Sequence, residues 1–150
     1  IALDVVFAER DRYDSKEITP DDALAVSLRK GRVVLGYAMT FDGGHQAPRS
    51  CVQHPLGLAV IHPSYDPSGD PFFHATGAVC NLESLSEAAG ASGFLNAAPD
   101  PDGILRRVPM LVEFDGRVFP SLSLAAVTKF TESKPVAVRI SNVNSATLVM

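Results

Sequence analysis

The feature that most constrains the fold is a strand–helix–strand succession at the start of the chain. Residues 2–7 and 33–39 are short, apolar and rich in β-branched side chains, which is typical of strands buried on both faces. Between them, residues 19–22 (Thr-Pro-Asp-Asp) combine a helix cap, a first-turn proline and two acids suited to the positive helix end. Gly31 supplies the stop. The pattern predicts a parallel βαβ unit.

The rest of the chain adds helices, strands and one long loop. Residues 40–75 are rich in Gly, Pro, His, Ser and Asp, which predicts a loop holding one short strand at 58–61. Ser84 and Glu87 have capping-box spacing and predict a helix that ends near Gly90. The other expected elements are a strand at 75–79, a turn at 100–103, strands at 104–114 and 117–119 around an Asp-Gly hairpin turn, a helix from Pro120-Ser121 to 130, and terminal strands at 136–140 and 147–150.

These elements predict one α/β domain over residues 1–150. We expect a mixed, largely parallel central sheet with about three helices and a C-terminal hairpin. Hydrophobic residues make up 46% of the chain and charged residues 20%, enough for a real core. The net charge of -4, with scattered basic residues, argues against nucleic acid as a partner.

Nothing in the chain indicates a membrane span. No apolar run reaches the roughly 18 residues that a spanning helix needs, and no signal peptide is visible. The chain starts without Met, directly in an apolar run. We therefore expect a fragment of a longer protein.

Few motifs point to catalysis, a cofactor or a metal. The four histidines, His45, His54, His62 and His74, match no metal-binding spacing, and there is no nucleophile elbow or phosphate loop. Cys51 and His54 place a thiol and an imidazole close in sequence, but folding rather than spacing makes a catalytic pair. We predict no catalytic residue, no cofactor and no metal.

The two cysteines allow two interpretations. Cys51 and Cys80 fit no four-ligand zinc pattern. They could be buried free thiols, as Cys often is. In an oxidising compartment they could form a disulfide that closes a loop of about 30 residues and stabilises the fold by roughly 3 kcal/mol.

Charged residues supply the remaining candidates. Asp4 falls inside an apolar strand, where a buried carboxylate needs a partner, or it is a pocket residue at a strand end. Arg106 and Arg107 follow the acidic turn on an expected strand, so they should face opposite sides. One of them is expected to pair with Asp102, Asp100 or Asp4, either as a purely structural contact or as an anion site.

Several blocks together resemble one known family, the CHASE domain of type 2. The most specific part is Asp-Pro-Asp-Gly at 100–103 followed by Arg-Arg-Val-Pro at 106–109. Gly-Phe-Leu-Asn at 93–96 and Phe-Pro-Ser-Leu at 119–122 flank it, and residues 3–11 and 22–25 resemble the family's start. The resemblance covers roughly residues 1–130, and the loop at 40–75 and the cysteines are not part of it.

The resemblance implies a sensory domain outside the cytoplasmic membrane, in the periplasm of Gram-negative bacteria. It implies membrane helices on both sides of the domain and an output such as an adenylate or guanylate cyclase, a histidine kinase, a diguanylate cyclase or a Ser/Thr kinase. The family motif carries no catalytic residue. The expected partners are an unknown small ligand or signal and a second copy of the parent protein.

We expect a ligand site to be lined by the long loop and by polar residues at strand ends. The candidate residues are Asp4, Asn96, Asp100, Asp102, Arg106 and Arg107. Two alternatives come from other classes: a hydrolase-like enzyme, which needs convergent carboxylates or histidines, and a dimerisation module without a ligand, which needs a large apolar interface.

Overall fold

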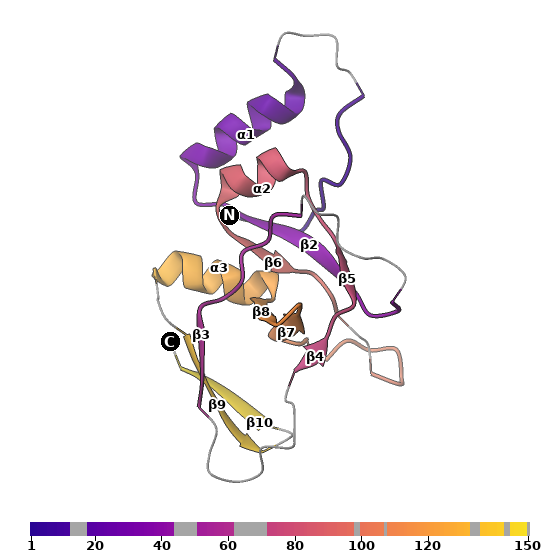
Figure 1. Cartoon of the computed structure of the whole chain (residues 1–150), viewed down its shortest axis with the longest axis vertical. Helices are drawn as coiled ribbons and strands as arrows, with labels where there is room; N and C mark the ends of the chain where they lie inside the picture. The colour runs from indigo at the N-terminus through magenta and orange to yellow at the C-terminus, as the bar shows by residue number, and fades with distance from the viewer. Residues whose placement is uncertain are drawn as a thin grey trace.

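The computed structural model describes residues 1–12, 18–43, 51–61, 72–97, 100–106, 108–132, 136–142 and 145–149. A central sheet lies between helices (Figure 1). Its strands are β1 (Ala2–Leu3), β2 (Val34–Thr40), β5 (Gly77–Val79) and β6 (Ser92–Phe94). β2 pairs in parallel with β1 and β6 and antiparallel with β5. The predicted mixed, largely parallel central sheet is confirmed.

Helix α1 (Pro20–Lys30) forms as its flanking residues predict. Thr19 caps it: the Thr19 hydroxyl accepts a hydrogen bond from the Asp22 backbone N–H at 3.1 Å. The Asp22 carboxylate accepts one in return from the Thr19 backbone N–H. Gly31 ends the helix, and its N–H donates to the Leu28 carbonyl. Strand, helix and parallel strand therefore follow in the predicted order.

The first strand is shorter than predicted, because other groups occupy the same edge of β2. Beyond Leu3, the Gly36 carbonyl accepts a hydrogen bond at 2.8 Å from the side-chain amide of Asn81. The side-chain oxygen (Oδ1) of Asn81 in turn accepts a hydrogen bond from the Phe7 backbone N–H at 2.7 Å. Asn81 is buried, and it provides the hydrogen bond to this edge of β2 between the end of β1 and the start of β5.

Helix α2 (Glu83–Ala89) ends at Gly90 as predicted, but it does not start with a capping box at Ser84. Its N-cap is Leu82, which makes no side-chain cap bond, and Ser84 lies in the first turn. The start of the helix is held instead by a long-range hydrogen bond, which the Leu82 N–H donates to the Phe7 carbonyl at 2.7 Å. At the other end, Gly90 takes the left-handed conformation with φ of 63°.

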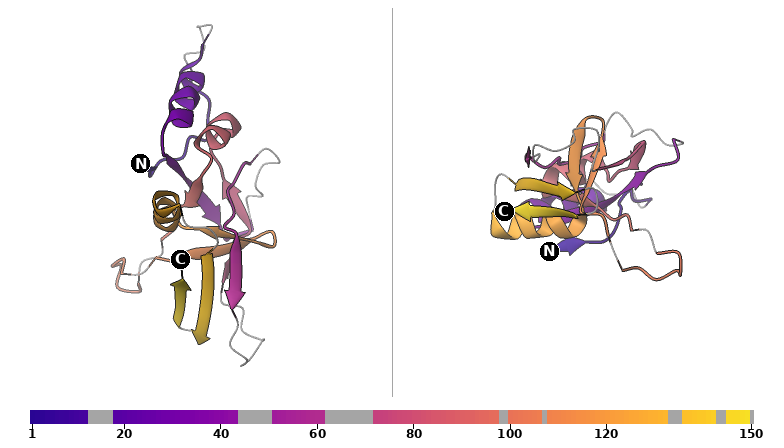
Figure 2. Two further views of the ribbon diagram at one scale, coloured as in Figure 1. Left: turned by 90° about the vertical axis from the view of Figure 1, so that its left-hand side faces the viewer. Right: turned by 90° about the horizontal axis from the view of Figure 1, so that it is seen from below.

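Helix α3 (Leu122–Thr131) lies on the opposite side of the sheet from α1 and α2 (Figure 2). Ser121 caps it by accepting from the Leu124 N–H at 3.3 Å, whereas Pro120 still belongs to the preceding strand. The close approach depends on Gly93, which lies opposite Gly36 in the β2–β6 ladder. A Cβ on Gly93 would lie 2.6 Å from the Leu122 Cα.

Two further sheets complete the described fold. The first contains β4 (Phe73–His74), β7 (Leu111–Phe114) and β8 (Arg117–Pro120), and β4 was not predicted. The second contains β3 (Leu58–Ile61), β9 (Val136–Asn142) and β10 (Ser145–Val149), so the predicted C-terminal hairpin and short loop strand are confirmed.

The hairpin between β7 and β8 follows its Asp-Gly signature, with positive φ at both Asp115 and Gly116. Its first strand starts at Leu111, so the strand predicted from residue 104 is wrong over its first half. Two local features account for this. The Ile104 carbonyl is used by the acidic turn, where it accepts from the Asp100 N–H at 3.0 Å, and Pro109 has no N–H to donate.

The apolar side chains form two clusters along β2. Leu35 joins the first cluster, with Leu28 of α1 and Leu85 of α2. Tyr37 joins the second, with Phe94 and Phe119. Within the described ranges, no helix is both long enough and apolar enough to cross a bilayer.

The glycine contact yields a stability prediction. Gly93→Ala is expected to lower the free energy of unfolding by about 3 kcal/mol, because the new methyl group would displace the start of α3. Urea unfolding of the purified chain measures this. Gly57→Ala is the matched control, since no atom lies within 4 Å of its added Cβ. Equal losses in the two variants would contradict the close-approach explanation.

Candidate functional site

The acidic turn and Arg106 form one polar cluster. Arg106 contacts the Asp102 carboxylate at 2.8 Å and the Asp100 carboxylate at 3.2 Å. The Gly103 N–H closes the turn on the Asp100 carbonyl at 2.8 Å, and Gly103 has φ of 80°. The predicted turn, and the predicted pairing of one arginine with its acids, are therefore confirmed.

The electrostatics of this cluster are those of a surface contact. The Arg106 guanidinium, followed by the Ile104 backbone N–H, lowers the pKa of Asp102. The two carboxylates, Asp102 first, raise the pKa of Arg106. The side chains of Arg106 and Asp102 are each about half exposed (50% and 51%), so solvent screens the pair and its contribution to stability is small.

Within the described part of the chain, Asp4 and Asn96, two other predicted site residues, do not bond to this cluster. Asp4 is exposed just beyond β1, so the expected buried position is wrong. Asn96 uses its whole amide on β2: it accepts from the Met39 N–H at 2.7 Å and donates to the Met39 carbonyl at 2.8 Å. No hydrogen bond or ion pair between described residues links Asp4 or Asn96 to Arg106. Arg107 lies outside the described residues.

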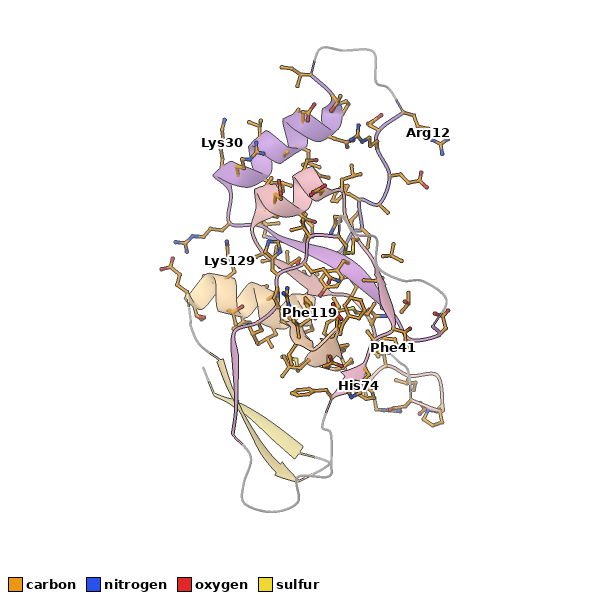
Figure 3. All side chains as sticks on the ribbon, in the orientation of Figure 1. Arg12, Lys30, Phe41, His74, Phe119 and Lys129 are labelled. Atoms are coloured by element: carbon orange, nitrogen blue, oxygen red, sulfur yellow. A yellow bond between two sulfur atoms is a disulfide. The ribbon has the colours of Figure 1, made fainter. Side chains whose placement is uncertain are left out.

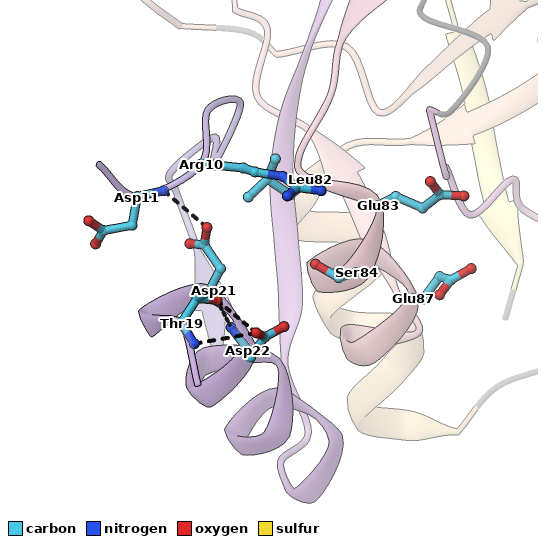
Figure 4. Close-up of a pocket in the computed structure, with 9 residues that line it drawn as sticks. All are labelled: Arg10, Asp11, Thr19, Asp21, Asp22, Leu82, Glu83, Ser84 and Glu87. Atoms are coloured by element: carbon cyan, nitrogen blue, oxygen red, sulfur yellow. Dashed lines mark hydrogen bonds between the residues drawn. The ribbon is translucent and has the colours of Figure 1, made fainter. Parts of the chain in front are cut away.

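A first cavity, of about 370 Å³, lies between the starts of α1 and α2 (Figure 4). Five carboxylates and Arg10 line it. Two of the carboxylates serve local structure, since Asp22 completes the cap of α1 and Asp21 accepts from the Asp11 N–H at 3.0 Å. Among the residues that the structure describes, no three His, Cys, Asp or Glu side chains are arranged to hold a metal ion.

A second and larger cavity is a groove of about 840 Å³ between α3 and residues 54–57 of the long loop. His54 stands in its wall, with its Nδ1 3.0 Å from the Ser92 hydroxyl. Ser92 also accepts from the His54 backbone N–H at 3.3 Å, so the loop is fixed to the first residue of β6. Lys129 of α3 and the Arg32–Glu132 ion pair line the same groove.

The surroundings of His54 disfavour protonation of its ring. Burial is the main cause of its lowered pKa, and the positive charge of Lys129 adds to the effect. A neutral imidazole beside an ammonium group can take part in acid–base chemistry, and its ring N–H can donate a hydrogen bond to an anion. A thiol partner for His54 is ruled out, because Cys51 forms a disulfide with Cys80 at a Cα–Cα distance of 5.7 Å.

A third cavity, of about 530 Å³, has the disulfide half-cystine Cys51 and Gln53 in its wall. The amide nitrogen of Gln53 is buried and makes no hydrogen bond, and the same is true of the hydroxyl oxygen of Tyr37 in the core. Burial raises the pKa of Tyr37 far above its usual range. Tyr37 does not line this cavity, and the groove beside His54 is larger, so the groove is the better candidate site.

The sequence reasoning missed most of this groove. Ser92 and Lys129 carried no motif, and His54 was considered only as a metal ligand and as a partner of Cys51. Its partner Ser92 lies 38 positions away in the chain, so no local sequence pattern predicts the pair. The one available signal was the long loop itself, part of which does line the groove.

Taken together, the described elements form a small α/β domain with a groove between α3 and the long loop. The chain belongs to the CHASE2 domain family, whose family model matches residues 1–149. This is a family of extracellular sensory domains, not of catalytic ones, so a sensory role replaces the hydrolase alternative. A search of curated proteins and a search of solved structures gave no match.

The state of His54 predicts how stability depends on pH. Its pKa is lower in the folded chain than the value of about 6.5 in the unfolded chain, so the unfolded chain binds more protons between these two values. The free energy of unfolding should therefore fall as the pH falls below about 6.5. We expect a His54-dependent loss of no more than about 1 kcal/mol by pH 5.5, since the ring is partly exposed.

Urea unfolding at pH 7.5, 6.5 and 5.5 measures this dependence. The His54→Gln variant is the control, because every other group titrates equally in both proteins. The wild type should lose more stability than the variant on acidification. A variant that loses as much as the wild type would contradict the assignment.

Proposed function

We propose that this chain is the input domain of a membrane signalling protein and works on the periplasmic face of a bacterial cytoplasmic membrane. The observation that carries the proposal is the family match over residues 1–149. In this proposal, membrane helices of the parent protein flank the domain. The output is a nucleotide cyclase, a histidine kinase or a diguanylate cyclase.

The disulfide supports a location outside the cytoplasm. Bonds of this kind persist in the periplasm and outside the cell, whereas cytoplasmic thiols are kept reduced. The Cys51–Cys80 bond joins the start of the described loop segment to the residue after β5. It therefore holds this segment against the body of the domain, and residues 54–57 of the segment line the groove.

Exposed apolar side chains support a second copy as the partner. Ile104, Leu105 and Val108 follow the acidic turn, and each is about half exposed. Such a group favours contact with another protein surface over contact with water. In a homodimeric parent, a signal acts by binding two arrangements of the dimer with different affinity.

The location can be tested on the full-length parent in its native membrane. After denaturation without reductant, a polyethylene-glycol maleimide should label neither Cys51 nor Cys80, and it should label both once a reductant is added. The Cys51→Ser variant is the matched control, since its Cys80 should react without reductant. Labelling of both thiols in the untreated wild type would place the domain in a reducing compartment and refute the proposal.

A second arm tests sensing. Replacing residues 1–150 of the parent by a flexible linker should leave the output at one fixed level under growth conditions that change the output of the intact parent. A linker variant that still responds would remove the sensory role from this domain.

A further inference from the structure

The groove beside His54 is assembled from four separate parts of the chain. Residues 54–57 form one wall, and the Ser92 hydroxyl fixes them from β6. The last turn of α3 forms the opposite wall. The ends of α1 and α2 contribute Gly31 and Gly90. Because this polar hollow is built by several elements, its shape is set by the whole fold and not by one loop.

The charges in the groove are not balanced locally. Arg32 pairs with Glu132 at 2.7 Å, so each of these two charges is already compensated. Lys129 is only partly exposed, and it makes no hydrogen bond or ion pair with any described residue. Its side chain extends from α3 toward the side of the molecule where α1 and α2 lie (Figure 3). Among the described residues, the positive charge of Lys129 is therefore uncompensated, and it contributes to the lowered pKa of His54.

The rest of the lining is mainly apolar or lacks side chains. Pro55, Leu56, Ala91, Pro120 and Ala125 contribute carbon surface. An occupant that matches this groove carries one negative charge at one end and a small apolar body. A dianion fits less well, because Glu132 would face its second charge.

We propose that the groove between α3 and residues 54–57 binds a small monocarboxylate, with the carboxylate between Lys129 and His54 and the apolar body against Leu56 and Ala125. The proposal rests on the sensory function above and gives that function a ligand class. Lys129 supplies the charge, and His54 donates a hydrogen bond from its ring.

Protons should strengthen this binding. Besides His54, five polar side chains line the groove: Ser92 from β6, Thr128 and Lys129 from α3, and the paired Arg32 and Glu132. A bound carboxylate offsets the repulsion between Lys129 and a protonated His54. It therefore raises the pKa of His54, and by linkage the affinity rises as the pH falls.

The test uses benzoate as the probe and the 150-residue chain in a two-dimensional amide NMR titration. Benzoate should shift the signals of the groove residues and saturate in the millimolar range, as its few atoms allow. Its neutral isostere benzamide should bind at least about tenfold more weakly, and affinity for benzoate should be severalfold higher at pH 5.5 than at pH 8. The His54 ring signals should report a higher pKa when benzoate is bound.

Lys129→Gln should weaken benzoate binding about tenfold without lowering the melting temperature. Lys30→Gln is the matched control: Lys30 is likewise a last-turn lysine, on α1, but it does not line the groove, so affinity should not change. The proposal is overturned if benzamide binds as well as benzoate, if Lys129→Gln binds like the wild type, or if no groove signal saturates.

This experiment is independent of the signalling assay. Binding of benzoate in the groove without any response of the parent would leave the site standing and weaken the sensory role. A parent that responds to its growth conditions while benzoate does not bind in the groove would refute the carboxylate site and leave the sensory role standing.

Discussion

The backbone of β2 is hydrogen-bonded along both of its edges, and the other elements take their places from that pairing. On one edge, β1, the Asn81 side chain and β5 follow one another. On the other edge, β6 is followed by the Asn96 side chain. Leaving a buried backbone group unpaired costs about as much free energy as a lost hydrogen bond. Where the neighbouring strands end, the side chains of the two asparagines therefore take over the hydrogen bonds to β2. They allow the chain to leave the sheet without losing its hydrogen bonds.

The groove depends on this arrangement. β6 enters the sheet at Ser92, and the Ser92 hydroxyl holds His54 from the long loop. The next residue, Gly93, lets α3 approach the sheet closely, which brings Lys129 to the opposite wall. The disulfide at Cys51 holds the same loop a few residues earlier. The proposed carboxylate site thus forms where β6, α3 and the loop pack together, and no single element contains it.

Features that depend on residues close together in the chain were predicted correctly from the sequence. The Thr19 cap, the Asp-Gly hairpin and the Arg106 pairing all follow from side chains a few positions apart. Prediction failed where distant residues compete for the same backbone. β1 is cut short by Asn81, and α2 starts from a bond between Leu82 and Phe7 instead of from Ser84. Asn96 was predicted as a site residue because it follows a strand, and in the structure its amide is hydrogen-bonded to β2.

The fold depends on β2 as the rigid centre of the domain, and amide hydrogen exchange measures that rigidity directly. If both edges are closed, the amides of Leu35 and Met39 should be among the slowest in the described chain and should exchange only when the whole domain unfolds. Replacing Asn96 by Ala should speed exchange at Met39 far more than at Leu35, which donates to the Ala91 carbonyl. Wild-type exchange at Leu35 and Met39 as fast as at Ala23, in the first turn of α1, would contradict it.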